Sequence, residues 1–150
     1  MRMLLAGLVA LSACGPGDSC TGDVQWALFD VAYFVPFCEG DFVEIRAFSE
    51  QEYLVDVNLQ FRGIDGDGAV SGSWALAFDG VSSHSETRAE IPSYDTETGW
   101  WRVHVLHWLS QTEAAEVAAL EASTATLSAT FTDVSGNSVA STVDLVAVAP

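Results

Sequence analysis

The chain is dominated by short runs in which apolar and polar residues alternate, the period of β-strands that bury one face. In the clearest run, residues 53–62, apolar side chains from Tyr53 to Phe61 alternate with polar ones from Asp56 to Arg62. The turn-rich segment after it predicts a hairpin with the next run, and a Gly-Asn turn predicts a second hairpin at the end of the chain. Other runs predict strands at residues 41–49, 72–79, 81–91, 99–109, 124–132 and 139–148. Residues 24–37 are apolar on both faces, as expected of a central strand or a pair of strands.

A short helix is expected before the closing hairpin. Ser110-Gln111-Thr112-Glu113 matches a capping box, and residues 114–122 are rich in alanine, glutamate and leucine. Seven or eight short strands, with turn signals about every 8–12 residues, predict an antiparallel β-sandwich. The fold class is therefore all-β, with one short helix before the last two strands.

Composition and charge limit the function classes. The chain has 150 residues, of which 49% are hydrophobic and 17% charged, enough for one domain with a core and too apolar for a disordered chain. Five arginines against 21 acidic residues give a formal net charge of −16, which excludes a basic groove for nucleic acid. Some of these charges, Glu86, Arg88 and Glu90, share one face of residues 81–91, as expected of a sheet edge protected by charge.

The first 14 residues resemble the export signal of bacterial lipoproteins. Arg2 precedes an apolar stretch at residues 4–11, which is too short to span a bilayer as a helix and is followed by small residues. The tetrad Leu11-Ser12-Ala13-Cys14 is similar to a lipobox. This resemblance implies cleavage before Cys14, acylation of that cysteine and a membrane anchor made by the lipid. An ordinary secretory signal is the alternative.

The same resemblance implies a location and a division of the chain. Gly15 stands where the family's inner-membrane retention signal often has an aspartate, which favours the outer membrane of the cell envelope, on its periplasmic or outer surface. The expected segments are a signal peptide at residues 1–13, the lipidated cysteine and a flexible tether at 14–22, and a β-sandwich domain at 23–150.

Cys20 and Cys38 remain as a pair if Cys14 carries lipid. An oxidising envelope compartment permits a disulfide between them. With 17 intervening residues, closing this loop would contribute about 3 kcal/mol on the chain-entropy model. Two buried free thiols are the alternative.

The end of the chain resembles bacterial immunoglobulin-like domains. Residues 125–133 and 139–148, joined through Gly136-Asn137, are similar to the Thr/Ser/Val-rich hairpin that closes those domains. A short helix before the penultimate strand also occurs in that architecture. The chain departs from the family in lacking the usual inter-sheet cysteine pair and a tyrosine corner. The resemblance implies an immunoglobulin-like sandwich.

One loop motif raises the question of calcium. Asp65-Gly66-Asp67-Gly68 combines acids with a glycine turn, which makes Asp65 and Asp67 weak candidate ligands. The spacing of an EF-hand fails here, because Trp74 or Ala69 falls where the loop needs an acidic ligand. Turn geometry in a hairpin loop explains the motif without a metal. No cofactor is therefore expected beyond this weak calcium candidate.

The aromatic run at residues 99–109 holds the best candidate binding residues. Trp100, Arg102, His104 and Trp108 share one face of the expected strand, while Trp101, Val103, Val105, His107 and Leu109 form the face more suited to the core. Exposed tryptophan and arginine are typical of binding hot spots. In the alternative, Trp100 and Trp108 cap the sandwich ends or lie under the helix.

Catalytic and zinc chemistry find no support in the sequence. There is no Gly-x-Ser-x-Gly elbow. His104 and His107 face opposite sides of one strand, and His84 stands in a serine-rich stretch that we interpret as a loop, so a zinc site is not expected. We predict a non-catalytic binding or structural module of the envelope, held to the membrane by its lipid and binding an envelope protein or a glycan. A small envelope hydrolase and an accessory subunit of a larger complex are the alternatives.

Overall fold

A computed structural model describes residues 20, 22–29 and 34–150. The expected signal peptide, Cys14 and most of the tether lie outside these residues, so the lipoprotein interpretation stays a prediction. The bond expected between Cys20 and Cys38 also stays a prediction.

The first sheet has β4 (Tyr53–Phe61) and β8 (Trp100–Trp108) at its centre. All its pairings are antiparallel, and the register of β4 with β8 runs from Leu54 opposite Trp108 to Phe61 opposite Trp101. Three shorter strands complete this sheet, two beside β4 and one beside β8: β1 (Val24–Leu28), β3 (Arg46–Ala47) and β7 (Ser93–Asp95).

The second sheet has the order β2 (Phe42–Glu44), β10 (Ser138–Val148), β9 (Thr124–Thr132), β5 (Val70–Phe78) and β6 (Val81–Glu90). Its pairings are antiparallel except that β2 runs parallel to β10. One short helix, α1 (Ala114–Ala118), precedes the last two strands.

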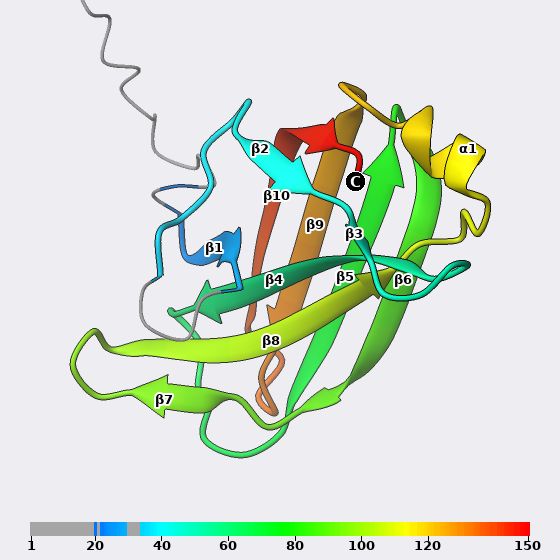
Figure 1. The fold of residues 1–150 in the computed structure, drawn as a ribbon. Coiled ribbons are helices and arrows are strands. Elements are labelled where there is room, and N and C mark those ends of the chain that lie inside the picture. The colour runs from blue at the N-terminus through cyan, green and yellow to red at the C-terminus, as the bar shows by residue number, and fades with distance from the viewer. Residues whose placement is uncertain (1–19, 21, 30–33) are drawn as a thin grey trace, which may run out of the picture.

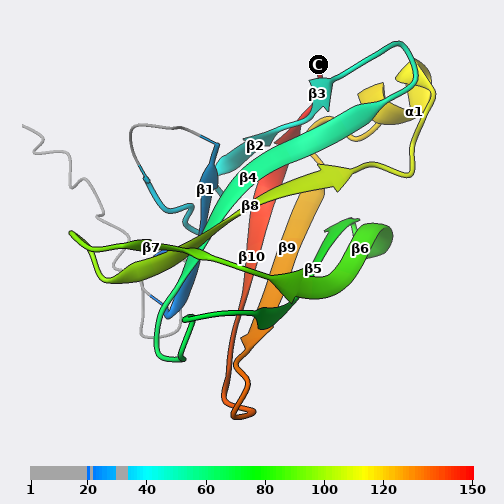
Figure 2. The same ribbon diagram turned by 90° about the horizontal axis from the view of Figure 1, so that it is seen from below.

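The two sheets face each other with their strands crossing. In Figure 1, β4, β8 and β7 run roughly horizontally in front of β5, β9 and β10, which run roughly vertically. Figure 2 shows the same two layers from below. The inner faces meet in a core where Phe61 of β4 and Phe131 of β9 are both fully buried and stack with ring centroids 4.3 Å apart. This stack joins the sheets by direct contact between aromatic side chains.

The predicted β-sandwich, the helix before the last two strands and the closing hairpin of β9 and β10 are confirmed. The described part of the chain forms ten strands rather than seven or eight. One reason is that residues 41–49, expected as a single strand, are divided between the layers: β2 pairs in the second sheet, Ile45 is buried at the crossing, and β3 pairs in the first.

The predicted hairpin between residues 53–62 and 72–79 is wrong. β4 lies in the first sheet and β5 in the second, so the turn-rich residues between them carry the chain from one layer to the other. Both strands bury their apolar face in the same core. Alternation shows which face is buried but does not say in which layer a strand lies, and proximity in sequence misled the pairing.

The predicted capping box is also wrong. Glu113 is the N-cap of α1 and makes no side-chain cap hydrogen bond. The backbone N–H of Ser110 instead donates to Ser83 Oγ of β6 at 3.3 Å. The helix is only five residues long, and Ala122 adopts a left-handed φ of 60° just beyond it. No helix among the described residues has the length and apolar character needed to cross a bilayer.

Replacing Phe131 by alanine should lower the free energy of unfolding by about 3–5 kcal/mol, because it empties the site where the two sheets touch. Urea unfolding at pH 7 measures the change. The control Val134→Ala removes an 83% exposed side chain and should alter stability by less than about 0.5 kcal/mol. Equal, small effects of the two variants would contradict a core organised around this stack.

Candidate functional site

The alternation of β8 divides its side chains as the sequence predicts. Val103, Val105 and His107 are buried in the core, whereas His104 and Trp108 are exposed on the outer face of the first sheet. A strand places successive side chains on opposite faces. The outward set is therefore available to a partner along the second half of the strand.

The structure separates the four predicted binding residues into two pairs. At the β7 end, the guanidinium of Arg62 lies 4.5 Å above the Trp100 ring, and Arg102 forms a 2.7 Å ion pair with Asp95. Trp100 and Arg102 are thus half-buried and engaged within the protein. His104 and Trp108, further along β8, line the same two pockets.

A polar cluster lies at the centre of the outer face and is formed by Asp56 of β4, His104 of β8 and Arg46 of β3. His104 Nε2 lies 2.6 Å from Asp56 Oδ1, and Arg46 Nη1 lies 3.5 Å from Asp56 Oδ2. The Asp56 side chain is only 14% exposed, while His104 and Arg46 are much more open. We call these three residues the Asp56 cluster.

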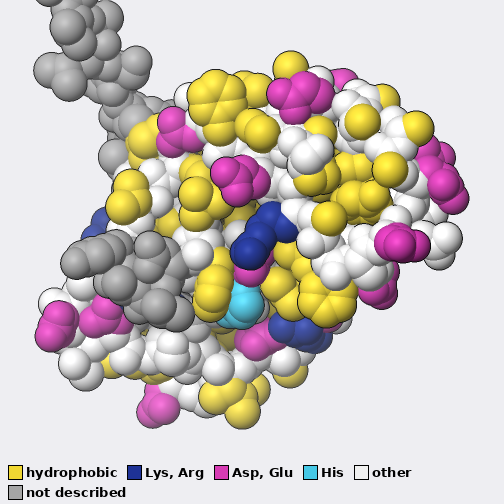
Figure 3. All heavy atoms as spheres, viewed as in Figure 1, with side chains coloured by type: hydrophobic (Ala, Val, Ile, Leu, Met, Phe, Trp, Pro, Cys, Tyr) yellow, Lys and Arg dark blue, Asp and Glu magenta, His cyan; other side chains and the backbone are white. Residues whose placement is uncertain are grey.

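Three aromatic side chains surround the Asp56 cluster and form what we call the aromatic rim: Phe29, Phe48 and Trp108. Phe29 stacks on His104 with centroids 4.2 Å apart, and Phe48 meets Trp108 edge-on at 5.2 Å. Their exposed fractions are 41%, 69% and 37%. Figure 3 shows hydrophobic side chains gathered around a histidine and an arginine on this face.

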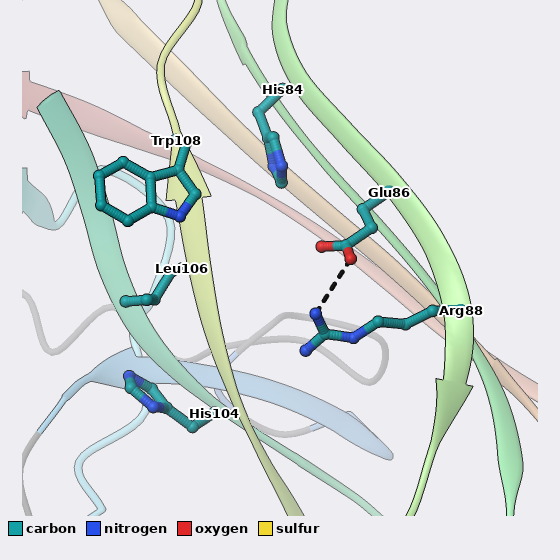
Figure 4. A pocket seen from close by; sticks show the side chains of 6 residues that line it. All are labelled: His84, Glu86, Arg88, His104, Leu106 and Trp108. Atoms are coloured by element: carbon teal, nitrogen blue, oxygen red, sulfur yellow. Dashed lines mark hydrogen bonds and ion pairs between the residues drawn. The ribbon is translucent and has the colours of Figure 1, made fainter. Parts of the chain in front are cut away.

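Two of the hollows that border these residues lie beside β8. A pocket of about 350 Å³ is lined by Leu54, the Asp56 cluster, Phe48 and Trp108, among others. A second hollow of about 470 Å³ lies between β6 and β8 and is lined by His84, Glu86, Arg88, His104, Leu106 and Trp108. In Figure 4 the side chains of β6 extend toward β8, whose own side chains point away from them. We call the second hollow the β6–β8 cleft.

A histidine pair lies at the inner wall of this cleft. His84, which the sequence analysis placed in a loop, is in fact in β6, and its Nδ1 is 3.0 Å from Nδ1 of His107. Burial lowers the pKa of His107 to about 3, with a further lowering from His84. The pKa of His84 is also lowered by burial, against an opposing effect of Glu86. Because one Nδ1 must accept the hydrogen bond, at least one ring is neutral.

In the candidate calcium loop, hydrogen bonds between aspartate side chains and backbone N–H groups hold the turn. Asp65 Oδ1 accepts the backbone N–H of Asp67 at 2.9 Å, and the N–H of Asp65 donates to Asp133 Oδ2 at 3.3 Å. Asp133 also accepts the backbone N–H groups of Ser135 and Asn137. Within residues 20, 22–29 and 34–150, no group of three or more His, Cys, Asp or Glu side chains could hold a metal ion.

Sequence reasoning missed the residues that β8 meets from other strands. Phe29, Arg46 and Asp56 come from three segments, and only the strand pairing places them beside His104. One local signal existed: Asp56 was expected on the polar face of its strand. The register that sets Asp56 opposite Leu106, the next residue after His104 on the same face of β8, could not be read from spacing.

Chemically, the site offers hydrogen-bonding groups within an apolar surround. The Asp56 carboxylate orients the imidazole of His104 and leaves its Nδ1 to a partner, while Arg46 supplies N–H donors. Among the described residues, neither of these two pockets is lined by a serine, threonine or cysteine. A few polar groups on an apolar surface is the composition of a recognition site.

Comparisons with known proteins give one structural similarity. No protein-family model and no curated protein matches the chain. The β-sandwich is similar in structure to the CooA pilin subunit from enterotoxigenic Escherichia coli, at 9% sequence identity and a TM-score of 0.38, over 84% of this chain and 99% of that chain.

The buried His107 should make stability fall with acid. At pH 7 the residue is neutral in both states; below its unfolded pKa of 6.5 the unfolded chain binds a proton that the folded protein, with a pKa of about 3, does not. The resulting loss is about 2 kcal/mol by pH 5 and continues toward pH 3. Urea unfolding at pH 7 and pH 5 should show this loss in the wild type and a smaller one in His107→Leu. An equal loss in both proteins would contradict the assignment.

Proposed function

We propose that the protein is a lipid-anchored envelope module that binds a partner through the Asp56 cluster and the aromatic rim, without catalysing a reaction. The observation that carries this proposal is the exposure of three large aromatic side chains around an ordered polar centre. Contact with water is unfavourable for such surface, and covering it would stabilise a complex by about 25 cal/mol per Å² of apolar area before the costs of association.

The composition of the site supports binding to an envelope protein or a glycan. Tryptophan and arginine are frequent among residues that dominate binding energy. The planar rings of Phe48 and Trp108 provide rigid surface, and the Asp56 cluster provides both donors and an acceptor. Because Arg46, Asp56, His104 and Trp108 lie on the paired strands β3, β4 and β8, little conformational entropy of these residues is lost when a partner binds.

The location within the envelope rests on the leader. The lipobox-like Leu11-Ser12-Ala13-Cys14 supports acylation of Cys14, and Gly15 supports sorting to the outer membrane. Two or three acyl chains would anchor the protein firmly, whereas one chain binds a membrane only marginally. The closing hairpin supports an immunoglobulin-like assignment of the sandwich, which we keep as part of the proposal.

A small envelope hydrolase is the second candidate, favoured by the 2.6 Å contact between His104 and Asp56. A carboxylate that orients a histidine is a common arrangement for proton transfer. The described residues that line the pockets beside this pair include no hydroxyl or thiol side chain to act as nucleophile. Such an enzyme would have to use His104 as the base for an attacking water, which makes His104→Ala the decisive variant.

A photo-cross-linking residue tests the binding face in cells. Benzoylphenylalanine in place of Phe48 should form covalent adducts with a partner, whereas the same residue in place of Val134, in the exposed β9–β10 turn, should form none. Adding Trp108→Ala should reduce the adducts at position 48 by about tenfold or more, as for a binding hot spot. Equal adducts at both positions, or ester hydrolysis that His104→Ala abolishes, would overturn the proposal.

Labelling with palmitate tests the anchor separately. The wild-type chain should incorporate label and fractionate with membranes, and Cys14→Ser should lose both properties because the acylated thiol is gone. Cys38→Ser is the matched control and should keep both. Label retained by Cys14→Ser would contradict the lipoprotein interpretation while leaving the binding face untouched.

A further inference from the structure

One edge of β8 lacks a strand partner along two thirds of its length, from Val103 to Trp108. On one side, β4 pairs with eight of the nine residues of β8, from Trp101 to Trp108. On the other side, β7 pairs only with residues from Trp100 to Arg102. Within the part of the chain that the structure describes, no strand continues this pairing beyond Arg102.

The backbone of this edge is oriented outward. The N–H of Leu109 donates to the carbonyl of Tyr53, so odd-numbered residues of β8 direct their backbone groups toward β4. On the far edge of β4, the N–H of Phe29 donates to the carbonyl of Asp56, which agrees with this alternation. In an antiparallel pair the intervening residues point the other way. The N–H and C=O groups of His104, Leu106 and Trp108 are therefore directed into the β6–β8 cleft.

The strand across the cleft faces this edge without pairing to it. His84, Glu86 and Arg88 stand opposite the core-facing residues of β5, so their side chains lie on the inner face of the second sheet and project into the gap. The cleft is bounded at one end by β7 and at the other by the hydrogen bond from Ser110 to Ser83. Its volume of about 470 Å³ is within the range of ligand pockets.

We propose that this edge of β8 binds a short extended segment of a cationic partner protein as an added strand. This inference rests on the proposed function and names the partner class for the same face. The segment would form backbone hydrogen bonds with His104, Leu106 and Trp108. Adding a strand to an exposed sheet edge is a recurring mode of peptide recognition, in which the backbone gives affinity and alternate side chains give specificity.

The excess of one acidic side chain on the β6 face, counted over Glu86, Arg88 and Glu90, favours a cationic segment. Arg88 is already paired with both Glu86 and Glu90 and lies 5.0 Å from the Trp74 ring centroid, so the β6 face has one negative charge in excess. Side chains of the segment that point inward would meet this face, and lysine or arginine there would pair with Glu86. Those that point outward would lie beside Leu106 and Trp108, where apolar side chains fit.

A second copy of the chain is a poorer occupant of the same edge. Two β8 edges could pair around a two-fold axis, but each chain carries a formal net charge of −16. The repulsion between two such chains opposes self-association. The same negative charge attracts a basic partner and increases its association rate. We therefore assign the edge to a different, positively charged chain.

Amide hydrogen exchange of the full-length protein, followed by NMR, tests the edge directly. The amides of His104 and Leu106 should exchange rapidly, whereas those of Val105 and His107, which bond to β4, should be protected. Adding a capped seven-residue peptide that alternates lysine and valine should slow exchange at His104 and Leu106 by about tenfold or more at saturation. The effect should weaken with added salt, which screens the attraction.

Matched controls separate strand addition from general charge attraction. A peptide of the same sequence that is N-methylated at alternate residues on its β8-facing edge keeps the charge but loses the backbone donors, and should give no protection. A peptide alternating glutamate and valine should not bind. Glu86→Gln should weaken binding up to about fivefold, the upper range for a partly exposed ion pair, while Glu97→Gln, the same charge change in the β7–β8 turn, should not.

Each outcome decides a different point. Protection of His104 and Leu106 without peptide, increasing with protein concentration, would show a second copy on the edge and overturn the proposal. Equal protection by the methylated peptide, or none by the lysine–valine peptide, would also overturn it. If the peptide gives no protection but adducts still form at position 48 in cells, the outer binding face stands and only the added strand is wrong. If no adducts form but the peptide protects the amides of His104 and Leu106, the added strand stands and the outer binding face is wrong.

Discussion

Burial of Val103, Val105 and His107 against the opposite sheet determines the orientation of the rest of β8. Because the side-chain period of a strand is two, placing these residues in the core directs His104, Leu106 and Trp108 outward. In the pairing of β4 with β8, the odd-numbered residues of β8 bond to β4, so the backbone groups of His104, Leu106 and Trp108 point toward the β6–β8 cleft. One buried face thus sets both the polar and aromatic surface and the unpaired edge beside it.

The local pattern of the sequence predicted more of the fold than of the site. Residues 124–132 and 139–148 alternate regularly around a Gly-Asn turn, and they form the hairpin that was expected. The pairing of β4 with β5 failed because either sheet satisfies the same alternation. The contacts of His104 with Asp56 and of His84 with His107 span 48 and 23 residues, so they depend on pairings that no local pattern encodes.

Charge is distributed so that the acidic surplus remains uncompensated. Each of the four arginines within the described residues has a carboxylate partner, and these pairs lie largely at the surface. Pairs of this kind contribute little to stability. The remaining acids give the protein a negative field that extends over about 8 Å at physiological salt. This field favours basic partners approaching any face and makes their association sensitive to ionic strength.

The parallel pairing of β2 with β10 has a consequence for the order of folding. Phe42 and Val146 are neighbours in the sheet although about a hundred residues separate them along the chain. During synthesis from the N-terminus, the early strands can pack together before the end of the chain is made. The backbone groups of β2 that pair with β10 form their hydrogen bonds only after β10 has been synthesised. Contacts between such distant segments form slowly, because the entropy of closing the loop is lost before the contact compensates for it. Until then the early strands need protection from other unpaired chains.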